Sequence, residues 1–255
     1  MISARFYVLS GGEIHADKGF MTLLQDVGQT CVIPIWQAYI DHPDAKIVWE
    51  SGFDPSNTLK EFPLKPPQYF KQSPEETLEA QLGMIGVRTD DIDFVIPSHL
   101  HSDHTGYLRL FSRKKAKILV QWSELRHAYV PEPFVRYLFH RSEFDIPDLN
   151  YQCIEGPYKV AEGVEIFPTP GHTPGHQSLI VRMDRTGPLI LTGDAAYFKE
   201  TLETLALPGI CTSPVDAIRS MQKIKQIANI EKGTIFYSHY LEQFRMMKKA
   251  PQYYD

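Results

Sequence analysis

The sequence predicts an α/β fold in which strands and helices form layers and polar residues gather where strands end. Short apolar runs typical of buried strands, such as residues 94–96 and 189–191, alternate with segments of helical periodicity, such as residues 214–228. At 255 residues and 43% hydrophobic content, the chain can bury a substantial core. We therefore expect a single domain over residues 1–255.

The N-terminal part is expected to contain three strands. Residues 6–9 form the first, which Ser10-Gly11-Gly12 ends, and residues 32–40 and 46–49 form the next two. Residues 13–31 have no sustained period and are predicted to form a long loop. An apolar patch on this loop indicates either a substrate wall or a partner surface. The patch consists of Phe20, Met21, Leu23 and Leu24.

Residues 56–72 are rich in proline and are predicted to form an irregular surface excursion. A helix start follows, with Ser73 as N-cap, Pro74 in the first helical position and Glu76 closing a capping box. Apolar residues then recur at helical spacing up to Gly86, which ends the element. They are Leu78, Leu82 and Ile85.

The central part of the chain contains strands at residues 94–96 and 117–120, and then an aromatic-rich segment at about 122–150. Pro131 and Pro133 interrupt this segment, which favours two short helices. Its aromatic side chains either pack in the core or form a lid over an apolar or ring-shaped substrate. His127 and His140 lack ligand spacing and are expected at the surface or on the lid.

The second half returns to strands, at residues 164–167, 177–181, 189–191 and 234–237. Ser213 and Pro214 predict the start of a helix with a buried apolar stripe. The polar motifs of this half again follow strands, and loops at strand ends are where layered α/β proteins carry their chemistry.

The most informative stretch runs from Ser98 to Tyr107, directly after the strand at 94–96. His99, His101, Asp103 and His104 place three imidazoles and a carboxylate within six positions, and these are ligands that divalent metals such as zinc prefer. A strand alternates its side chains, so His99 and His101 point the same way, and Asp103 and His104 can face a second position beyond the turn. Histidines used only as caps are the weaker alternative. The pattern predicts a dinuclear metal site.

This motif resembles that of the metallo-β-lactamase superfamily, and three later segments match the remaining motifs of the family: residues 169–176, residues 191–197 and residues 237–239. The resemblance implies an αββα sandwich and a set of seven ligands. Metal one would be held by His99, His101 and His172, metal two by Asp103, His104 and His239, and Asp194 would bridge them. Two Zn²⁺ ions are the first expectation, with iron, manganese or cobalt as alternatives.

The same resemblance suggests supporting roles for two further residues near these motifs. Glu50-Ser51-Gly52 resembles the Asp-Thr-Gly turn of the family, whose aspartate supports the metal site from behind the ligands. Glu50 is one methylene longer than aspartate, so it could reach the same partner or point away. His176 follows His172 by four residues but is expected to give structural support.

The run Asp194-Ala195-Ala196-Tyr197 resembles the Asp-x-x-Tyr of the lactonases that open N-acyl homoserine lactones (quorum quenching) and of pyridoxolactonase. The resemblance implies a hydrolase that opens a small cyclic ester by attack of a metal-bridging hydroxide, with Asp103 and Tyr197 taking part in catalysis. Glu50, and Tyr240 where many relatives carry aspartate, keep a cyclic amide, a carbamate or a thioester open as substrate. A redox di-iron protein and a non-catalytic binding module are weaker alternatives.

Composition limits the partners. A net charge of −5 argues against nucleic acid, and no apolar run approaches the ~20 residues that span a bilayer. The start of the chain lacks the apolar core of a signal peptide, and the three cysteines are odd in number and widely separated. We expect a cytoplasmic protein, monomer or homodimer, that acts on a small cyclic molecule.

Overall fold

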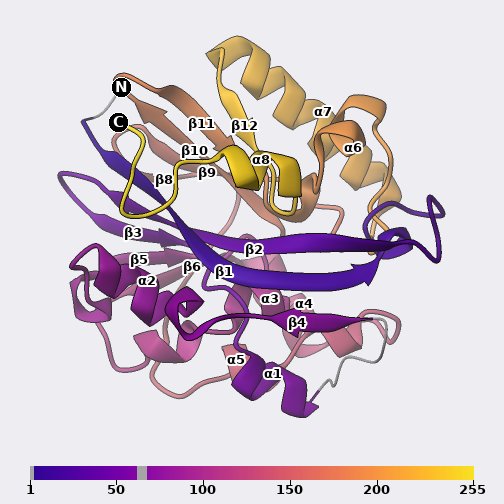
Figure 1. Ribbon diagram of the computed structural model, residues 1–255, viewed down its shortest axis with the longest axis horizontal. Helices are drawn as coiled ribbons and strands as arrows, with labels where there is room; N and C mark the ends of the chain where they lie inside the picture. The colour runs from indigo at the N-terminus through magenta and orange to yellow at the C-terminus, as the bar shows by residue number, and fades with distance from the viewer. Residues whose placement is uncertain (1–2, 62–67) are drawn as a thin grey trace.

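Two mixed β-sheets pack face to face, with helices on both outer sides (Figure 1). The computed structural model describes residues 3–61 and 68–255. Within these residues, one sheet has seven strands, in the order β4 (Tyr69–Lys71), β1 (Arg5–Asp17), β2 (Thr30–Asp41), β3 (Lys46–Trp49), β5 (Phe94–Ile96), β6 (Lys117–Gln121) and β7 (Asn150–Ile154). The other has five, in the order β12 (Thr234–Phe236), β11 (Gly187–Leu191), β10 (Gln177–Met183), β9 (Val164–Pro168) and β8 (Tyr158–Ala161).

The helices divide between the two outer faces. On the side of the seven-stranded sheet lie α1 (Pro55–Glu61), α2 (Leu78–Met84), α3 (Ser102–Thr105), α4 (Trp122–Tyr129) and α5 (Arg141–Phe144). On the side of the five-stranded sheet lie α6 (Lys199–Thr204) and α7 (Pro214–Glu231), and α8 (Leu241–Met246) contacts β2. Short 3-10 helices are η1 (Lys18–Phe20), η2 (Pro74–Glu76), η3 (Thr89–Asp91), η4 (Leu108–Phe111), η5 (Arg136–Leu138) and η6 (Gly193–Ala195).

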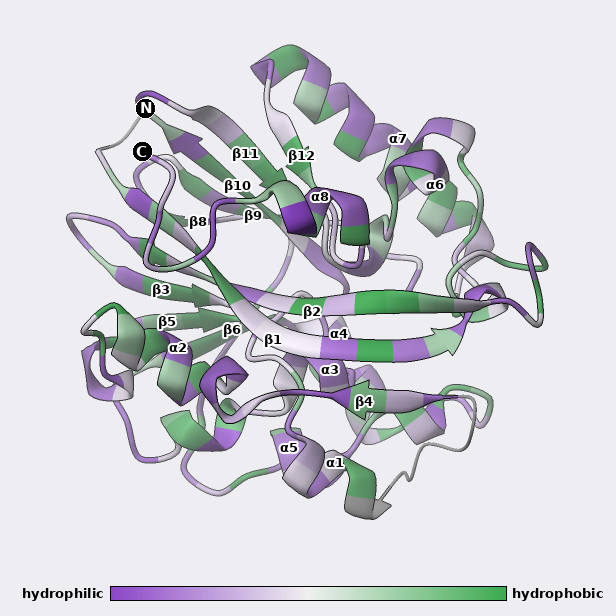
Figure 2. Ribbon diagram, viewed as in Figure 1, coloured by the Kyte–Doolittle hydropathy of each residue, from purple (hydrophilic) through white to green (hydrophobic). Residues whose placement is uncertain are grey.

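The alternation of side chains along β1 explains the layering. Phe6 and Val8 pack between the two sheets, whereas Tyr7 and Leu9 point the other way, into the core under α2. In the five-stranded sheet, Ile190 likewise faces away from the other sheet and packs under α7. Figure 2 shows the result as strongly apolar β10 and β11 beside an α7 of mixed character. The αββα sandwich expected from the sequence is confirmed.

The prediction that the first strand ends at Ser10-Gly11-Gly12 is wrong. β1 continues to Asp17 and pairs with β2 along its length, with a bulge between Ser10 and Glu13. Gly12 has a positive φ of 94°, and a side chain on Gly11 would meet Gln37 at 2.2 Å. The glycines therefore make room for a bulge and a close neighbour without ending the strand. The loop expected at 13–31 is shortened accordingly, to the turn between β1 and β2.

Two further expectations for the N-terminal half need correction. The irregular excursion expected at 56–72 contains α1 and β4, although residues 62–67 lie outside the described part. Glu76 does accept a hydrogen bond from the Ser73 backbone N–H at 2.8 Å, but it closes the 3-10 helix η2. The α-helix begins at Leu78, where Thr77 accepts from the Ala80 N–H at 3.3 Å. A second capping residue four positions along therefore starts the regular helix.

No helix among residues 3–61 and 68–255 combines the length and the apolar character needed to cross a membrane.

Candidate metal centre

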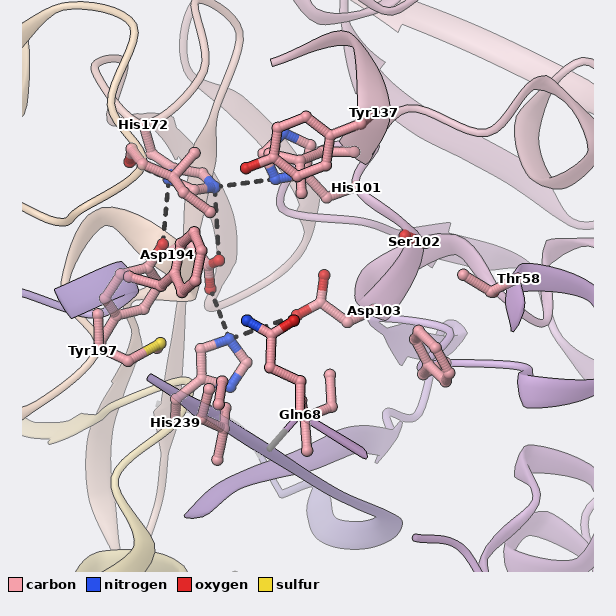
Figure 3. A pocket seen from close by; sticks show the side chains of 18 residues that line it. Thr58, Gln68, His101, Ser102, Asp103, Tyr137, His172, Asp194, Tyr197 and His239 are labelled. Carbon is pink, nitrogen blue, oxygen red and sulfur yellow. Dashed lines mark hydrogen bonds and ion pairs between the residues drawn. The ribbon is translucent and has the colours of Figure 1, made fainter. Parts of the chain in front are cut away.

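All seven residues predicted as ligands come together, although they lie on four separate segments of the chain. The segments follow the C-terminal ends of β5, β9, β11 and β12. Their donor atoms form two groups, and within each group the atoms lie within 4.8 Å of one another. The first group is His99, His101 and His172, and the second is Asp103, His104, Asp194 and His239. Figure 3 shows Asp194 between His172 on one side and His239 on the other.

The first group consists of imidazole nitrogens alone. His172 Nε2 lies 3.1 Å from His99 Nε2 and 3.1 Å from His101 Nδ1. Burial and the neighbouring imidazoles lower the pKa of both His99 and His101 well below the usual value, so both rings are neutral at pH 7. Neutral imidazoles with converging nitrogens are the form that binds a divalent metal.

The second group combines imidazoles with carboxylates. His104 Nε2 lies 3.4 Å from Asp194 Oδ1 and 3.5 Å from Asp103 Oδ2, and His239 Nε2 lies 3.2 Å and 3.5 Å from the same atoms. Neither His104 Nε2 nor Asp194 Oδ1 has a hydrogen-bond partner among the described residues, although both are buried. Buried polar atoms are rarely left unsatisfied, so these atoms fit a metal ion between them.

Electrostatics in the second group agree with this fit. Burial lowers the pKa of His104, but the carboxylates of Asp103 and Glu50 outweigh it and raise the pKa well above the usual value. Burial raises the pKa of Asp194, but the charges of His104 and His239 outweigh it and hold that pKa well below the usual range. The carboxylates of the second group therefore stabilise positive charge between them. Protons on the histidines provide this charge when no metal is bound, and a metal ion replaces them on binding.

Asp194 has the geometry of a bridge. Its Oδ2 faces the first group, 3.5 Å from His172 Nε2 and 3.8 Å from His99 Nε2. Its Oδ1 faces the second group, as described above. The preceding Gly193 has a positive φ of 51°, and a side chain there would meet Ser98 at 2.6 Å. Only glycine therefore allows the turn that brings Asp194 between the groups.

The outer nitrogens of four histidines are each held by a fixed partner. These contacts are His99 Nδ1 to Ser98 Oγ at 2.9 Å, His172 Nδ1 to Ile210 O at 2.9 Å, His239 Nδ1 to Pro34 O at 3.1 Å and His104 Nδ1 to Glu50 Oε1 at 3.1 Å. Such contacts set the orientation of the ring and leave the inner nitrogen to face the metal.

Glu50 supports the site from behind His104. Besides its contact with His104, it accepts a hydrogen bond from the Ser98 N–H at 3.0 Å through Oε2. Its backbone has a positive φ of 60°, unusual for a residue other than glycine. The carboxylate is therefore turned toward the site, and the longer side chain reaches the histidine.

Glu50→Gln should weaken metal binding roughly 10–100-fold, a typical cost for losing a group that orients a ligand. The amide keeps the size of the side chain but not the charge that faces His104 Nδ1. Chelator competition on the purified variant measures the effect. Metal retention equal to that of the wild type would show that the contact with His104 carries no weight.

His176 supports the bridge and is not part of either group. Its Nε2 accepts a hydrogen bond from the Asp194 backbone N–H at 2.9 Å, and its Nδ1 contacts Thr169 Oγ1 at 2.8 Å. Burial lowers its pKa to about 3, so the ring is neutral and can accept. This arrangement agrees with the supporting role expected from the sequence.

Tyr197 lies beside the first group and is 2% exposed. Its hydroxyl is 3.2 Å from His172 Nδ1, and its ring packs against His239 with the ring centroids 5.4 Å apart. Burial and the charge of Asp194 raise its pKa well above the usual value, so the phenol keeps its proton.

The metal centre forms one end of a cavity of about 170 Å³. Its apolar walls come from Ile14, Ala16, Phe20, Met21, Ile33, Phe53, Leu138 and Ile210, and Asp103, Tyr137 and Tyr197 also line it. Phe20 and Met21 belong to the apolar patch noted in the sequence. The other two residues of the patch, Leu23 and Leu24, do not line the cavity and are 43% and 83% exposed, so the patch divides between the cavity wall and the surface.

The segment 122–150 divides between wall and core. Tyr137 lines the cavity, whereas Phe144 is fully buried in the core and Phe139 packs on the His101 ring with centroids 4.6 Å apart. Of the two places expected for His127 and His140, the surface and the lid, the surface is wrong, because the two side chains are only 8% and 6% exposed. His127 packs against Phe139 with the ring centroids 5.1 Å apart, and His140 Nε2 contacts the Tyr137 carbonyl at 3.0 Å, which their spacing in the sequence does not reveal.

Sequence reasoning gave no role to Ser98 and Gln177. Ser98 Oγ contacts the Nδ1 atoms of both His99 and His104, at 2.9 and 3.4 Å. The Gln177 side-chain amide donates to the carbonyls of Pro97 and Leu119, and its backbone N–H donates to Ser98 O. The only signal was their position beside ligand motifs, which many loop residues share.

Residues 33–239 match the profile of the metallo-beta-lactamase superfamily. The chain belongs to this superfamily. An N-acyl homoserine lactonase of Bacillus sp. is 30% identical over 262 residues, which cover 99% of this chain and 100% of the relative. N-acyl homoserine lactonase AttM of Rhizobium radiobacter is 33% identical over 270 residues, with 100% of both chains covered.

Solved structures agree with the sequence relatives. An N-acyl homoserine lactone hydrolase with the product N-hexanoyl-L-homoserine bound at its catalytic metal center superimposes with a TM-score of 0.89, at 29% identity and with 100% of both chains covered. The superfamily fold, these relatives and the histidine–aspartate cluster identify the chain as a metal-dependent hydrolase whose cluster fits two divalent ions.

Proposed function

We propose that this superfamily member hydrolyses lactones, with N-acyl homoserine lactones as the substrate class. The observation that carries the proposal is a complete two-group metal cluster at the end of an apolar cavity, with a protonated tyrosine beside it. The lactonase relatives, which align over their whole length, support the same conclusion.

Each part of the site has a task in this reaction. Two divalent ions, when bound, would supply a hydroxide nucleophile at neutral pH and a Lewis acid for the ester carbonyl. His99, His101 and His172 would hold one ion, Asp103, His104 and His239 the other, and Asp194 both. The imidazole-rich donor set suits zinc, and its nitrogen and oxygen atoms also suit iron, manganese or cobalt.

The apolar walls of the cavity favour binding of a lactone that carries an acyl chain over binding of a lactone ring without one. The cavity walls near the cluster are apolar, and apolar surface removed from water contributes about 25 cal/mol per Å² to binding. Tyr137 and Leu138 contribute to these walls, which supports a lid role for the segment 122–150. The three free cysteines support a cytoplasmic location, where thiols stay reduced.

Purified protein should contain about two zinc ions per chain and open the ring of an N-acyl homoserine lactone faster than it hydrolyses lactams or thioesters with the same acyl chain. Elemental analysis and product detection on a matched substrate panel measure both properties. Shortening the acyl chain should raise KM more than it lowers kcat. A preference for the lactam or the thioester would contradict the proposal.

A further inference from the structure

Glu124 is a buried carboxylate to which the proposed function gives no role. It lies in the first turn of α4, directly after β6, and has 0% exposure. Its Oε1 accepts a hydrogen bond from the Leu100 N–H at 2.9 Å. Its Oε2 accepts from Thr173 Oγ1 at 2.6 Å and from the Gly175 N–H at 3.1 Å. One carboxylate thus joins two loops that are more than seventy residues apart in sequence.

Both loops carry ligands of the first group. Leu100 stands between His99 and His101, and Thr173 directly follows His172. The second group depends on other supports: Glu50 holds His104, His176 holds the backbone of Asp194, and the Pro34 carbonyl holds His239. Glu124 therefore bonds directly to the backbone beside the ligands of the three-histidine position, and its link to the second group is indirect, through Gly175, which precedes His176.

The loop that carries His172 also lies tightly against α4. A side chain on Gly175 would come within 2.1 Å of the Glu124 backbone nitrogen, so glycine permits this approach. Burying a carboxylate is costly unless it is fully hydrogen-bonded, and here three neutral donors do this. An apolar residue at this position would avoid the free-energy cost of burying a carboxylate, but it could not hydrogen-bond to the two loops.

We propose that Glu124 is a positioning residue that sets the distance between the His99–His101 loop and the His172 loop, and thereby the affinity of the three-histidine position for its metal ion. The inference rests on the ligand assignment of the proposed function. It adds that a change at Glu124, which lies behind the ligands, weakens the three-histidine position more than the neighbouring position.

Glu124→Gln tests this proposal with little change in size. The amide has one acceptor oxygen, and its NH₂ group would face an N–H or hydroxyl donor of one loop, so that loop loses its anchor. During chelator titration of the metal-loaded protein, one ion per chain should be released at a roughly 10–100-fold lower chelator concentration than in the wild type. The release of the second ion should shift by a much smaller factor, because Glu124 reaches that position only through Gly175 and His176. Cobalt-substituted protein, followed by absorption, shows which position empties.

Two variants of Thr173 form a matched pair for the case that Glu124→Gln folds poorly. Thr173→Val removes the hydroxyl that donates to Glu124 and should weaken the same single position, by less than Glu124→Gln because Gly175 still donates. Thr173→Ser keeps the hydroxyl and should restore wild-type retention. A merely structural role for this contact would not distinguish serine from valine in the affinity of one metal position alone.

Asp54→Asn controls for loss of a buried carboxylate in general. Asp54 is 2% exposed and accepts from the Ser56 N–H and from Arg109 Nε, both at 3.0 Å, without contacting either loop of the first group. It should lower the melting temperature but leave both metal positions unchanged. Equal weakening of both positions in Glu124→Gln, or none, would overturn the inference. A wild-type protein that binds fewer than two ions would overturn the proposed function as well.

Discussion

Replacing Asp194 with asparagine is expected to lower metal occupancy and to reduce lactone hydrolysis roughly a thousandfold or more, a loss of about 4 kcal/mol. Each carboxylate oxygen faces one group of histidines, so both metal positions depend on this one side chain. Asparagine has the same shape but no charge, and its NH₂ group would face imidazole nitrogens in place of an oxygen. Metal content per chain and kcat/KM measure the two effects.

Asp216→Asn is the matched control for this variant. Asp216 lies in the first turn of α7, where it contacts the Ser213 hydroxyl and no residue of the cluster. This variant should keep both metal ions and its activity. Two ions and full activity in Asp194→Asn itself would rule out the bridging assignment, and unchanged metal content with low activity would move the role of Asp194 from metal binding to the reaction.

Much of the cluster was predictable because its ligands occur in short local patterns. His99, His101, Asp103 and His104 occupy six positions after a strand, and their directions follow from strand geometry. The remaining ligands, His172, Asp194 and His239, came from resemblance alone. No local rule indicates that residues 140 positions apart meet, and the structure brings them together because β5, β9, β11 and β12 end at the same edge of the sandwich.

The errors have physical causes of the same kind. Two adjacent glycines favour the end of a strand, but here Gln37 and the Lys71 carbonyl occupy the space that side chains on Gly11 and Gly12 would fill. Ser73 has the chemistry of an N-cap, and only packing decides that the regular helix starts later, at Thr77. The side chain of Glu50 points toward the site because its backbone has a positive φ, and the residue type of Glu50 does not predict that conformation.

The geometry around the Tyr197 hydroxyl indicates which group its proton can reach, and the sequence motif alone does not. With its Nε2 facing the first group, a neutral His172 carries its proton on Nδ1 and donates it to the Ile210 carbonyl at 2.9 Å. His172 Nδ1 therefore has no lone pair to accept from Tyr197. The phenol proton is left available for a molecule in the cavity, which Tyr197 lines.

Tyr197→Phe should consequently leave folding and metal content intact while lowering turnover roughly ten- to a hundredfold, a loss of about 1.4–2.7 kcal/mol. In ring opening, charge builds first on the carbonyl oxygen and then on the departing ring oxygen. A donor at such an oxygen can contribute about 2.7–4 kcal/mol when it acts alone, and we expect less from Tyr197 because it would share this role with the metal ions. Steady-state kinetics on the metal-loaded variant measure the loss.

Comparing substrates with different leaving groups distinguishes proton donation by Tyr197 from a structural role. An aryl ester releases a stable phenolate and needs little help from a proton donor, so the loss in Tyr197→Phe should shrink on that substrate. Tyr151→Phe is the control, because the Tyr151 hydroxyl donates to the Phe144 carbonyl at 2.7 Å and Tyr151 does not line the cavity. It should lower stability without a change in rate on either substrate. If Tyr197→Phe lost the same factor on the lactone and on the aryl ester, or lost nothing on either, Tyr197 would act by packing against His172 and His239 and not by donating its proton.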